Sequence, residues 1–223
     1  MGINTIGGYD KLVPLILAKG LGNVDLSMFD EAKKNEIINA VGDAFIKKGR
    51  LVEAINAFSA TGNREKLVEI GDMLMKSASY SHAIEAFRLA ENRDLLAVLG
   101  NTCLEKGHLS DALKAFRILE NKEKLEEVGD ICIAKGKVDA ALEVFSVTGN
   151  RKKLAEVGER CFKEGQYTYA IKAFELSGDC KRLSEIGDIC LKEGLISTAL
   201  KVYRLAENDV MVKFINENFP SAD

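Results

Sequence analysis

The chain has 223 residues, of which 47% are hydrophobic and 29% are charged, so it can bury a core and is not a disordered segment. Its formal net charge of −3 argues against nucleic acid or an anionic membrane as a partner, because either would favour a basic surface. The five cysteines form no Cys-x-x-Cys motif, and their odd number argues against a disulfide framework. We therefore expect a soluble, cytoplasmic protein without a signal peptide or a membrane span.

Residues 1–34 precede a regular repeat and share only part of its pattern. Lys19-Gly20 and Phe29 lie 29 residues before Lys48-Gly49 and Phe58, which belong to the first regular unit. The segment GLGNVDLSMF between them is a poor helix former. We expect a degenerate N-terminal capping repeat here, because the terminal repeats of such arrays are commonly atypical.

Residues 35–208 contain six 29-residue units, each marked by a glycine that we number position 0. These glycines are Gly42, Gly71, Gly100, Gly129, Gly158 and Gly187. Positions −4, −1 and +3 are apolar, which completes the i, i+3, i+4, i+7 spacing of one helix face. The same spacing recurs at +9, +12, +13 and +16, where +12 is always alanine and +16 is always phenylalanine or tyrosine. Each unit therefore predicts two helices, A and B.

Turn residues separate the helices of the repeat. Glycine stands at +7 in every unit except one, where Ala78 replaces it, and this favours a reversal of the chain after helix A. An Asn or Asp such as Asn63 follows helix B and suits the N-cap of the next helix. We interpret Gly129 and Ala141 as small residues where the two helices cross, with Phe145 filling the space beyond them.

The unit resembles the tetratricopeptide repeat, as the segment VGDICIAKGKVDAALEVF illustrates. That family places a small residue in helix A, a glycine at the turn, and an alanine and an aromatic residue in helix B. The resemblance covers residues 35–208, although the period is 29 rather than 34 and no proline ends helix B. It implies an all-α protein, an α-α superhelix (α-solenoid) of about six antiparallel helix pairs with terminal caps. It also implies a non-catalytic scaffold that binds other proteins.

Residues 209–223 are predicted to form a C-terminal capping helix and a tail. Val212 stands at the leucine position of a further helix A, so this helix would cover the last apolar face of the array.

No motif for catalysis, a cofactor or a metal was found, so we expect no enzyme and no cofactor. The sequence has no G-x-G-x-x-G, P-loop or nucleophile elbow. His82 and His108 stand at non-equivalent repeat positions. The recurring cysteines at +3 would be about 10 Å apart in neighbouring units, too far apart to share a metal. Cys180 lies apart from them at a helix start.

Three rows on helix A are predicted to line the concave groove of the array. Position +1 is acidic in five of the six units: Asp43, Asp72, Asn101, Asp130, Glu159 and Asp188. Position +4 is always apolar: Ile46, Met75, Leu104, Ile133, Phe162 and Leu191. Glutamates at −2 form the groove edge: Glu69, Glu127, Glu156 and Glu185. These rows favour a peptide or partner protein as the ligand, and the acidic row favours a basic one.

Two alternatives stay open at this point. The acidic row could be only a solvated face, because Lys47 and three equivalent lysines lie four residues after it and suit i,i+4 pairs. The alternative function is nucleic-acid binding, because basic residues align at position −7: Arg64, Arg93, Lys122 and Arg151. The pattern does not identify the partner or the oligomeric state.

Overall fold

The structure is a computed structural model that describes residues 12–219. Within this range it contains 14 α-helices and one short 3-10 helix, and no β-strand. The parts of the two predicted caps that fall in residues 1–11 and 220–223 lie outside the described residues. The chain divides between Asn121 and Lys122 into two compact units, and each is described by itself.

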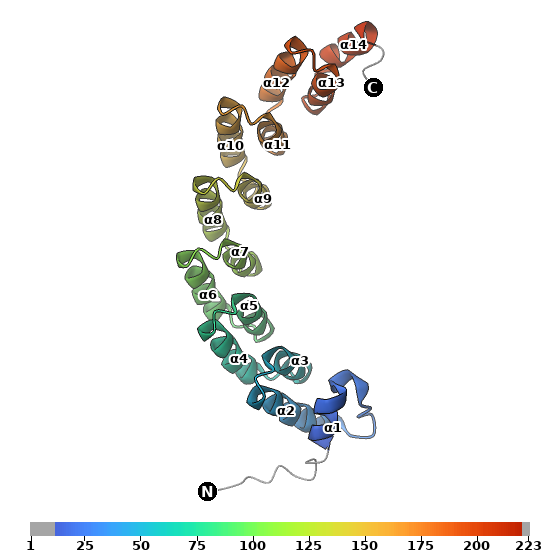
Figure 1. The fold of residues 1–223 in the computed structure, drawn as a ribbon, viewed down its shortest axis with the longest axis vertical. Coiled ribbons are helices and arrows are strands. Elements are labelled where there is room, and N and C mark those ends of the chain that lie inside the picture. Colours follow the sequence, from blue (N-terminus) through green and yellow to red (C-terminus); the bar gives the residue numbers. More distant parts are fainter. Residues whose placement is uncertain (1–11, 220–223) are drawn as a thin grey trace. The chain divides into compact units, whose positions relative to one another are not determined.

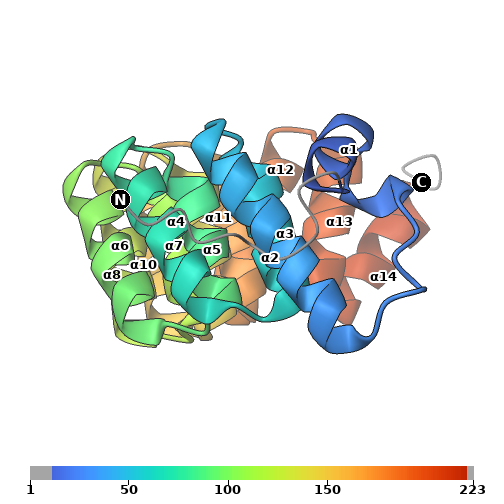
Figure 2. The same ribbon diagram turned by 90° about the horizontal axis from the view of Figure 1, so that it is seen from below.

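Unit 1 starts with α1 (Leu12–Lys19) and the 3-10 helix η1 (Leu21–Asn23), and α1 packs against α2. Three helix pairs follow: α2 (Glu31–Lys47) with α3 (Leu51–Thr61), α4 (Arg64–Lys76) with α5 (Tyr80–Leu89), and α6 (Arg93–Glu105) with α7 (Leu109–Ile118). Figures 1 and 2 show the members of these pairs lying side by side. Within this unit α3 also contacts α4, and α5 contacts α6, so the three pairs stack.

Unit 2 repeats this arrangement (Figure 1). Its pairs are α8 (Lys122–Ala134) with α9 (Val138–Thr148), α10 (Arg151–Lys163) with α11 (Tyr167–Ser177), and α12 (Cys180–Lys192) with α13 (Ile196–Leu205). The helix α14 (Asp209–Asn218) then packs on α13 and buries Ile215. We call the first helix of each pair an A helix and the second a B helix. The predicted all-α solenoid of stacked helix pairs is confirmed within each unit.

The core of every pair contains an aromatic ring packed directly on a glycine. The rings at position +16 are all buried: Phe58, Phe87, Phe116, Phe145, Phe174 and Tyr203. A Cβ atom added to Gly129 would lie 2.7 Å from Cε1 of Phe145, and one added to Gly42 would lie 2.5 Å from Cζ of Phe58. These distances are shorter than any contact that carbon atoms tolerate, so the ring requires glycine opposite it.

This contact corrects the expectation that Gly129 and Ala141 meet where the helices cross. The three nearest atoms to the missing Cβ of Gly129 belong to Phe145 and Val144 and none belongs to Ala141, which is also buried. The aromatic ring therefore occupies the space that the glycine leaves open, instead of filling space beyond it.

The turns have the geometry that the sequence predicts. Gly49 ends the first A helix with a φ of 72°, and Ala78 adopts the same left-handed conformation with a φ of 58°. The turns after the B helices also need a positive φ, and Glu91 supplies it at 54° where Gly62 supplies it one repeat earlier. Such backbone is unstrained for glycine and costs about 1 kcal/mol for other residues.

The N-cap prediction is confirmed at five junctions. Each cap residue accepts a hydrogen bond from the backbone N–H three positions on, at 3.0–3.2 Å. The caps are Asn63, Asn92, Asn150, Asp179 and Asn208. The helix that follows each cap therefore begins at the same position of the 29-residue repeat, which keeps successive repeats in register.

We predict that Ala78→Gly stabilises the protein and that Gly49→Ala destabilises it, each by about 1 kcal/mol. Both residues have a positive φ at the same repeat position, and a Cβ at residue 49 would meet no atom within 4 Å, so the backbone conformation alone decides the sign. The measurement is urea unfolding followed by circular dichroism. Two variants that shift the midpoint in the same direction would contradict the assignment of strain to Ala78.

Candidate functional site

The acidic row at position +1 lies on the A helices, where it faces the A helix of the following repeat. Three of its carboxylates form ion pairs with the cation at position −5 of that next helix. Asp43 pairs with Lys66 at 3.1 Å, Asp130 pairs with Lys153 at 2.8 Å, and Glu159 pairs with Arg182. The row is thus part of a contact between repeats, and Asp43 pairs across to the next helix instead of with Lys47 on its own helix.

The glutamates at position −2 extend these contacts. Lys66 also pairs with Glu69 at 2.9 Å, and Arg182 also pairs with Glu185 at 2.6 Å. The hydrogen bonds that Lys66 donates to Glu69, and next to Asp43, raise the pKa of Lys66 above its usual value. We call the set of one cation between two carboxylates an acid–cation–acid triad. The complete triads are Asp43–Lys66–Glu69 and Glu159–Arg182–Glu185, and each carries a net charge of −1.

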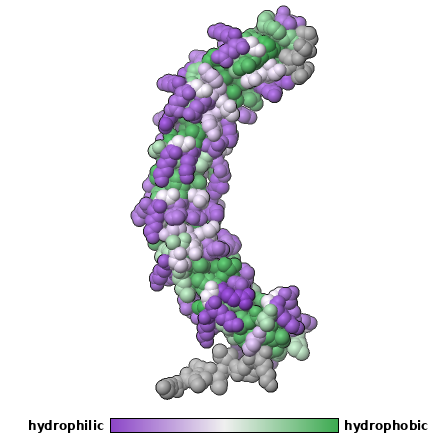
Figure 3. All heavy atoms as spheres, in the orientation of Figure 1, coloured by the Kyte–Doolittle hydropathy of each residue, from purple (hydrophilic) through white to green (hydrophobic). Residues whose placement is uncertain are grey.

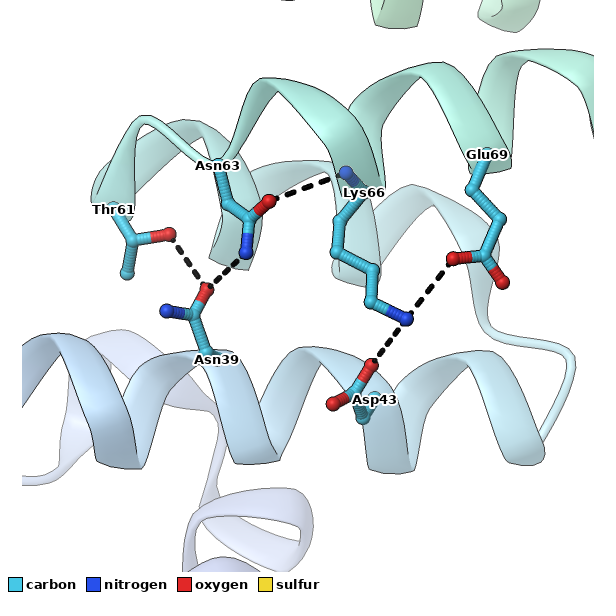
Figure 4. A network of polar contacts seen from close by, with 6 residues as sticks. All are labelled: Asn39, Asp43, Thr61, Asn63, Lys66 and Glu69. Carbon is cyan, nitrogen blue, oxygen red and sulfur yellow. Dashed lines mark hydrogen bonds and ion pairs between the residues drawn. The ribbon is translucent and has the colours of Figure 1, made fainter.

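A second polar contact accompanies the triad between α2 and α4 (Figure 4). The side-chain oxygen of Asn39 accepts hydrogen bonds from the hydroxyl of Thr61 at 2.9 Å and from the amide of Asn63 at 3.2 Å. Asn63 in turn accepts from the backbone N–H of Lys66 at 3.2 Å, as the N-cap of α4. The six labelled residues of Figure 4 therefore tie the first repeat to the second.

Two carboxylates of the row differ from this pattern. Asp188 accepts a hydrogen bond from the hydroxyl of Tyr203 at 2.6 Å. Burial, and next this hydrogen bond, raise the pKa of Tyr203 above its ordinary value. Asp72 has no hydrogen-bond or ion-pair partner within residues 12–219, and Leu95 stands where the cation would be. The five carboxylates of the acidic row therefore have three kinds of environment: an ion pair with the next repeat, a hydrogen bond from a tyrosine, or no polar partner in the described part of the chain.

The apolar row at position +4 is half-buried in all six repeats. Ile133 is one example. It lines a cavity of about 180 Å³ together with Val157 and Cys161 of the following repeat. Phe162 packs edge-to-face on Tyr167, with ring centroids 5.9 Å apart. The row thus contributes partly to packing and partly to the surface, and Figure 3 shows hydrophobic residues reaching the surface between hydrophilic ones.

The residues with reactive side chains are spread apart. Cys103, Cys132, Cys161 and Cys190 are buried, and burial raises the pKa of Cys103 to about 11, so its thiol stays protonated at neutral pH. His108 packs edge-to-face against Tyr80 at 4.9 Å between ring centroids. Within residues 12–219, no three His, Cys, Asp or Glu side chains lie close enough together to hold a metal ion.

Two of the four basic residues at position −7 contact the end of their own repeat. Arg64 pairs with Glu91 at 2.5 Å, and Arg93 donates to the backbone oxygen of Leu119 at 2.8 Å. These interactions cover the repeat edge, and nothing in them favours contact with a phosphate backbone. Of the helices between residues 12 and 219, none has the length and apolar character that crossing a membrane would need.

These helix pairs define an all-α helical repeat protein with tetratricopeptide-like architecture. Among solved structures, the chain is similar to MamA, with 19% sequence identity and a TM-score of 0.27 over 62% of this chain and 93% of MamA. It is also similar to a chain of the APC/C hetero-tetramer Cut9–Hcn1, with 16% identity and a TM-score of 0.26. That match covers 93% of this chain and 45% of the other chain.

No protein-family model matches the sequence, and no curated protein matches it. Both TM-scores are far below 0.5, so the assignment of the fold depends on the helix pairs of this chain itself.

The triads predict a measurable coupling between repeats. In a double-mutant cycle with Asp130→Ala and Lys153→Ala, we expect a coupling of about 0.2–1 kcal/mol at low salt that decreases as salt is added. The control is Asp72→Ala, which removes an equivalent carboxylate that has no cation and should change stability little. Equal losses from Asp130→Ala and Asp72→Ala would contradict the role of the ion pair.

Proposed function

We propose that this protein is a non-catalytic scaffold that binds a peptide or a partner protein along the exposed face of its A helices. The observation that supports the proposal is the recurrence, on successive A helices, of carboxylates beside half-buried apolar side chains. A surface that repeats along stacked helices suits an extended or helical partner, because each repeat offers the same kind of contact.

The charge of this face favours a basic partner. Lys66 and Arg182 each lie between two carboxylates, and Asp43 and Asp130 keep 41% and 53% of their side-chain surface exposed. A field of this sign steers cationic ligands to the surface and weakens as salt screens it. The apolar side chains at position +4 would supply the part of the binding energy that does not depend on salt.

The test is to recover a partner with the full chain from native cell extract and to titrate the purified partner at two salt concentrations. We expect Asp72→Asn, Asp130→Asn and Asp188→Asn together to weaken binding at least tenfold at low salt, which is about 1.4 kcal/mol. The difference between the variant and the unchanged protein should shrink at high salt, because the interaction is electrostatic.

Asparagine keeps the shape of each side chain and can still accept hydrogen bonds from Lys153 and Tyr203, so the fold should be preserved. Circular dichroism of the triple variant is the folding control. If the folded variant binds as tightly as the unchanged protein at low salt, the acidic row is only a solvated face.

A further inference from the structure

The polar network between α2 and α4 is lost one repeat further along the chain. Adding one 29-residue period to the residues of Figure 4 gives the equivalent residues between α4 and α6. They are Val68, Asp72, Ala90, Asn92, Leu95 and Val98. The positions of Asn39, Thr61, Lys66 and Glu69 have thus become apolar, and only the acid and the capping asparagine are unchanged.

Asp72 is therefore a carboxylate at a position where the preceding repeat forms an ion pair, but the residue equivalent to the cation Lys66 is Leu95. Asn92 is occupied in capping α6, since it accepts from the backbone N–H of Leu95 at 3.0 Å. Where the sequence supplies a cation, as with Lys66 on Asp43 and Lys153 on Asp130, the amino group reaches the carboxylate at about 3 Å. The repeat itself shows that a lysine or arginine side chain fits at this position.

Apolar side chains surround this carboxylate. Val68 and Met75 lie one turn before and one turn after Asp72 on α4, and both are half-buried. Leu95 is half-buried on α6, and Val98 is 52% exposed at the position where the triad between α2 and α4 carries the exposed Glu69. We call these five residues the Asp72 surface. Its apolar rim would strengthen an ion pair, because a covered rim excludes water from the charges.

We propose that the Asp72 surface is a docking position for a lysine or arginine of a partner protein, flanked in that partner by aliphatic side chains. The cation would pair with the Asp72 carboxylate as Lys66 pairs with Asp43, and the flanking residues would cover Val68, Met75, Leu95 and Val98. The inference depends on the proposed function and specifies one position and one chemistry within it. In the last repeat Met211 and Phe214 stand at the positions equivalent to Leu95 and Val98, but Tyr203 already donates to Asp188.

The probe is a phage-displayed library of random linear peptides selected on the full-length protein, followed by titration of the enriched peptides. We expect these peptides to carry Lys or Arg beside an aliphatic residue. They should bind Asp72→Asn at least about tenfold more weakly, since hydrogen bonds to charged groups contribute at least that much. The matched control is Asp139→Asn, a carboxylate on the B helix α9 that lies outside the acidic row and accepts hydrogen bonds from Tyr169 and Lys172, so the peptides should bind this variant as they bind the unchanged protein.

A second variant tests the same surface by filling it. Leu95→Lys combined with Val98→Glu restores the triad found between α2 and α4, so it should keep the fold and weaken the peptides by a similar factor. Enriched peptides that lose no affinity in either variant would overturn the inference, as would a selection that enriches no peptide. If only Asp130→Asn or Asp188→Asn weakens the peptides, the scaffold function stands and the docking position at Asp72 is wrong.

Discussion

The contact on which the structure depends is an aromatic ring of a B helix packed against a glycine of its A helix. The ring lies where a Cβ would stand, and this arrangement recurs in all six helix pairs. A glycine inside a helix costs about 1 kcal/mol relative to alanine, and burial of a whole aromatic side chain offsets that cost. The contact fixes how A and B helices pack, and the left-handed turns and capping residues then set where each helix begins and ends.

The sequence predicts this level of the fold well because each feature depends on residues within one 29-residue unit. The two apolar stripes, the glycine at the turn and the Asn or Asp cap are local patterns with a known helical meaning. The expected contact of Gly129 with Ala141 was wrong. Residue spacing predicts which face of a helix is buried, but it does not predict the direction in which the side chain of Phe145 points. The glycine at residue 62 indicates a positive φ, but the glutamate at the equivalent residue 91 does not, so the conformation of Glu91 could not be predicted from its residue type.

The candidate site could be predicted only in part. The acidic and apolar rows were visible in the sequence, but their neighbours depend on how one A helix lies beside the next. The lysine or arginine at position −5, three residues before the glutamate at −2, was a signal that was missed: it recurs in Lys66, Lys124, Lys153 and Arg182. This pairing divides the row into three groups: carboxylates that pair with the following repeat, Asp188, which accepts from Tyr203 of its own repeat, and Asp72, which has no partner within residues 12–219.

This division gives the repeats two roles that use the same positions. Where a triad is complete, the exposed charges contribute little stability individually but keep the face acidic. Where the triad is replaced by apolar residues, the polar contacts between repeats are lost, and we propose that a cation of a partner protein binds there instead. A scaffold built in this way can vary its binding positions by changing few surface residues, because the ring-on-glycine core stays the same in every repeat.

The most direct test of the ring-on-glycine contact is a double-mutant cycle of Gly129→Ala and Phe145→Leu, measured by urea unfolding. With Phe145 present, alanine should destabilise the protein despite its better helix propensity, because its Cβ would lie 2.7 Å from the ring. With leucine at residue 145, the same alanine should stabilise the protein by up to about 1 kcal/mol. The account predicts this reversal of sign. An alanine that changes stability in the same direction in both backgrounds would contradict it.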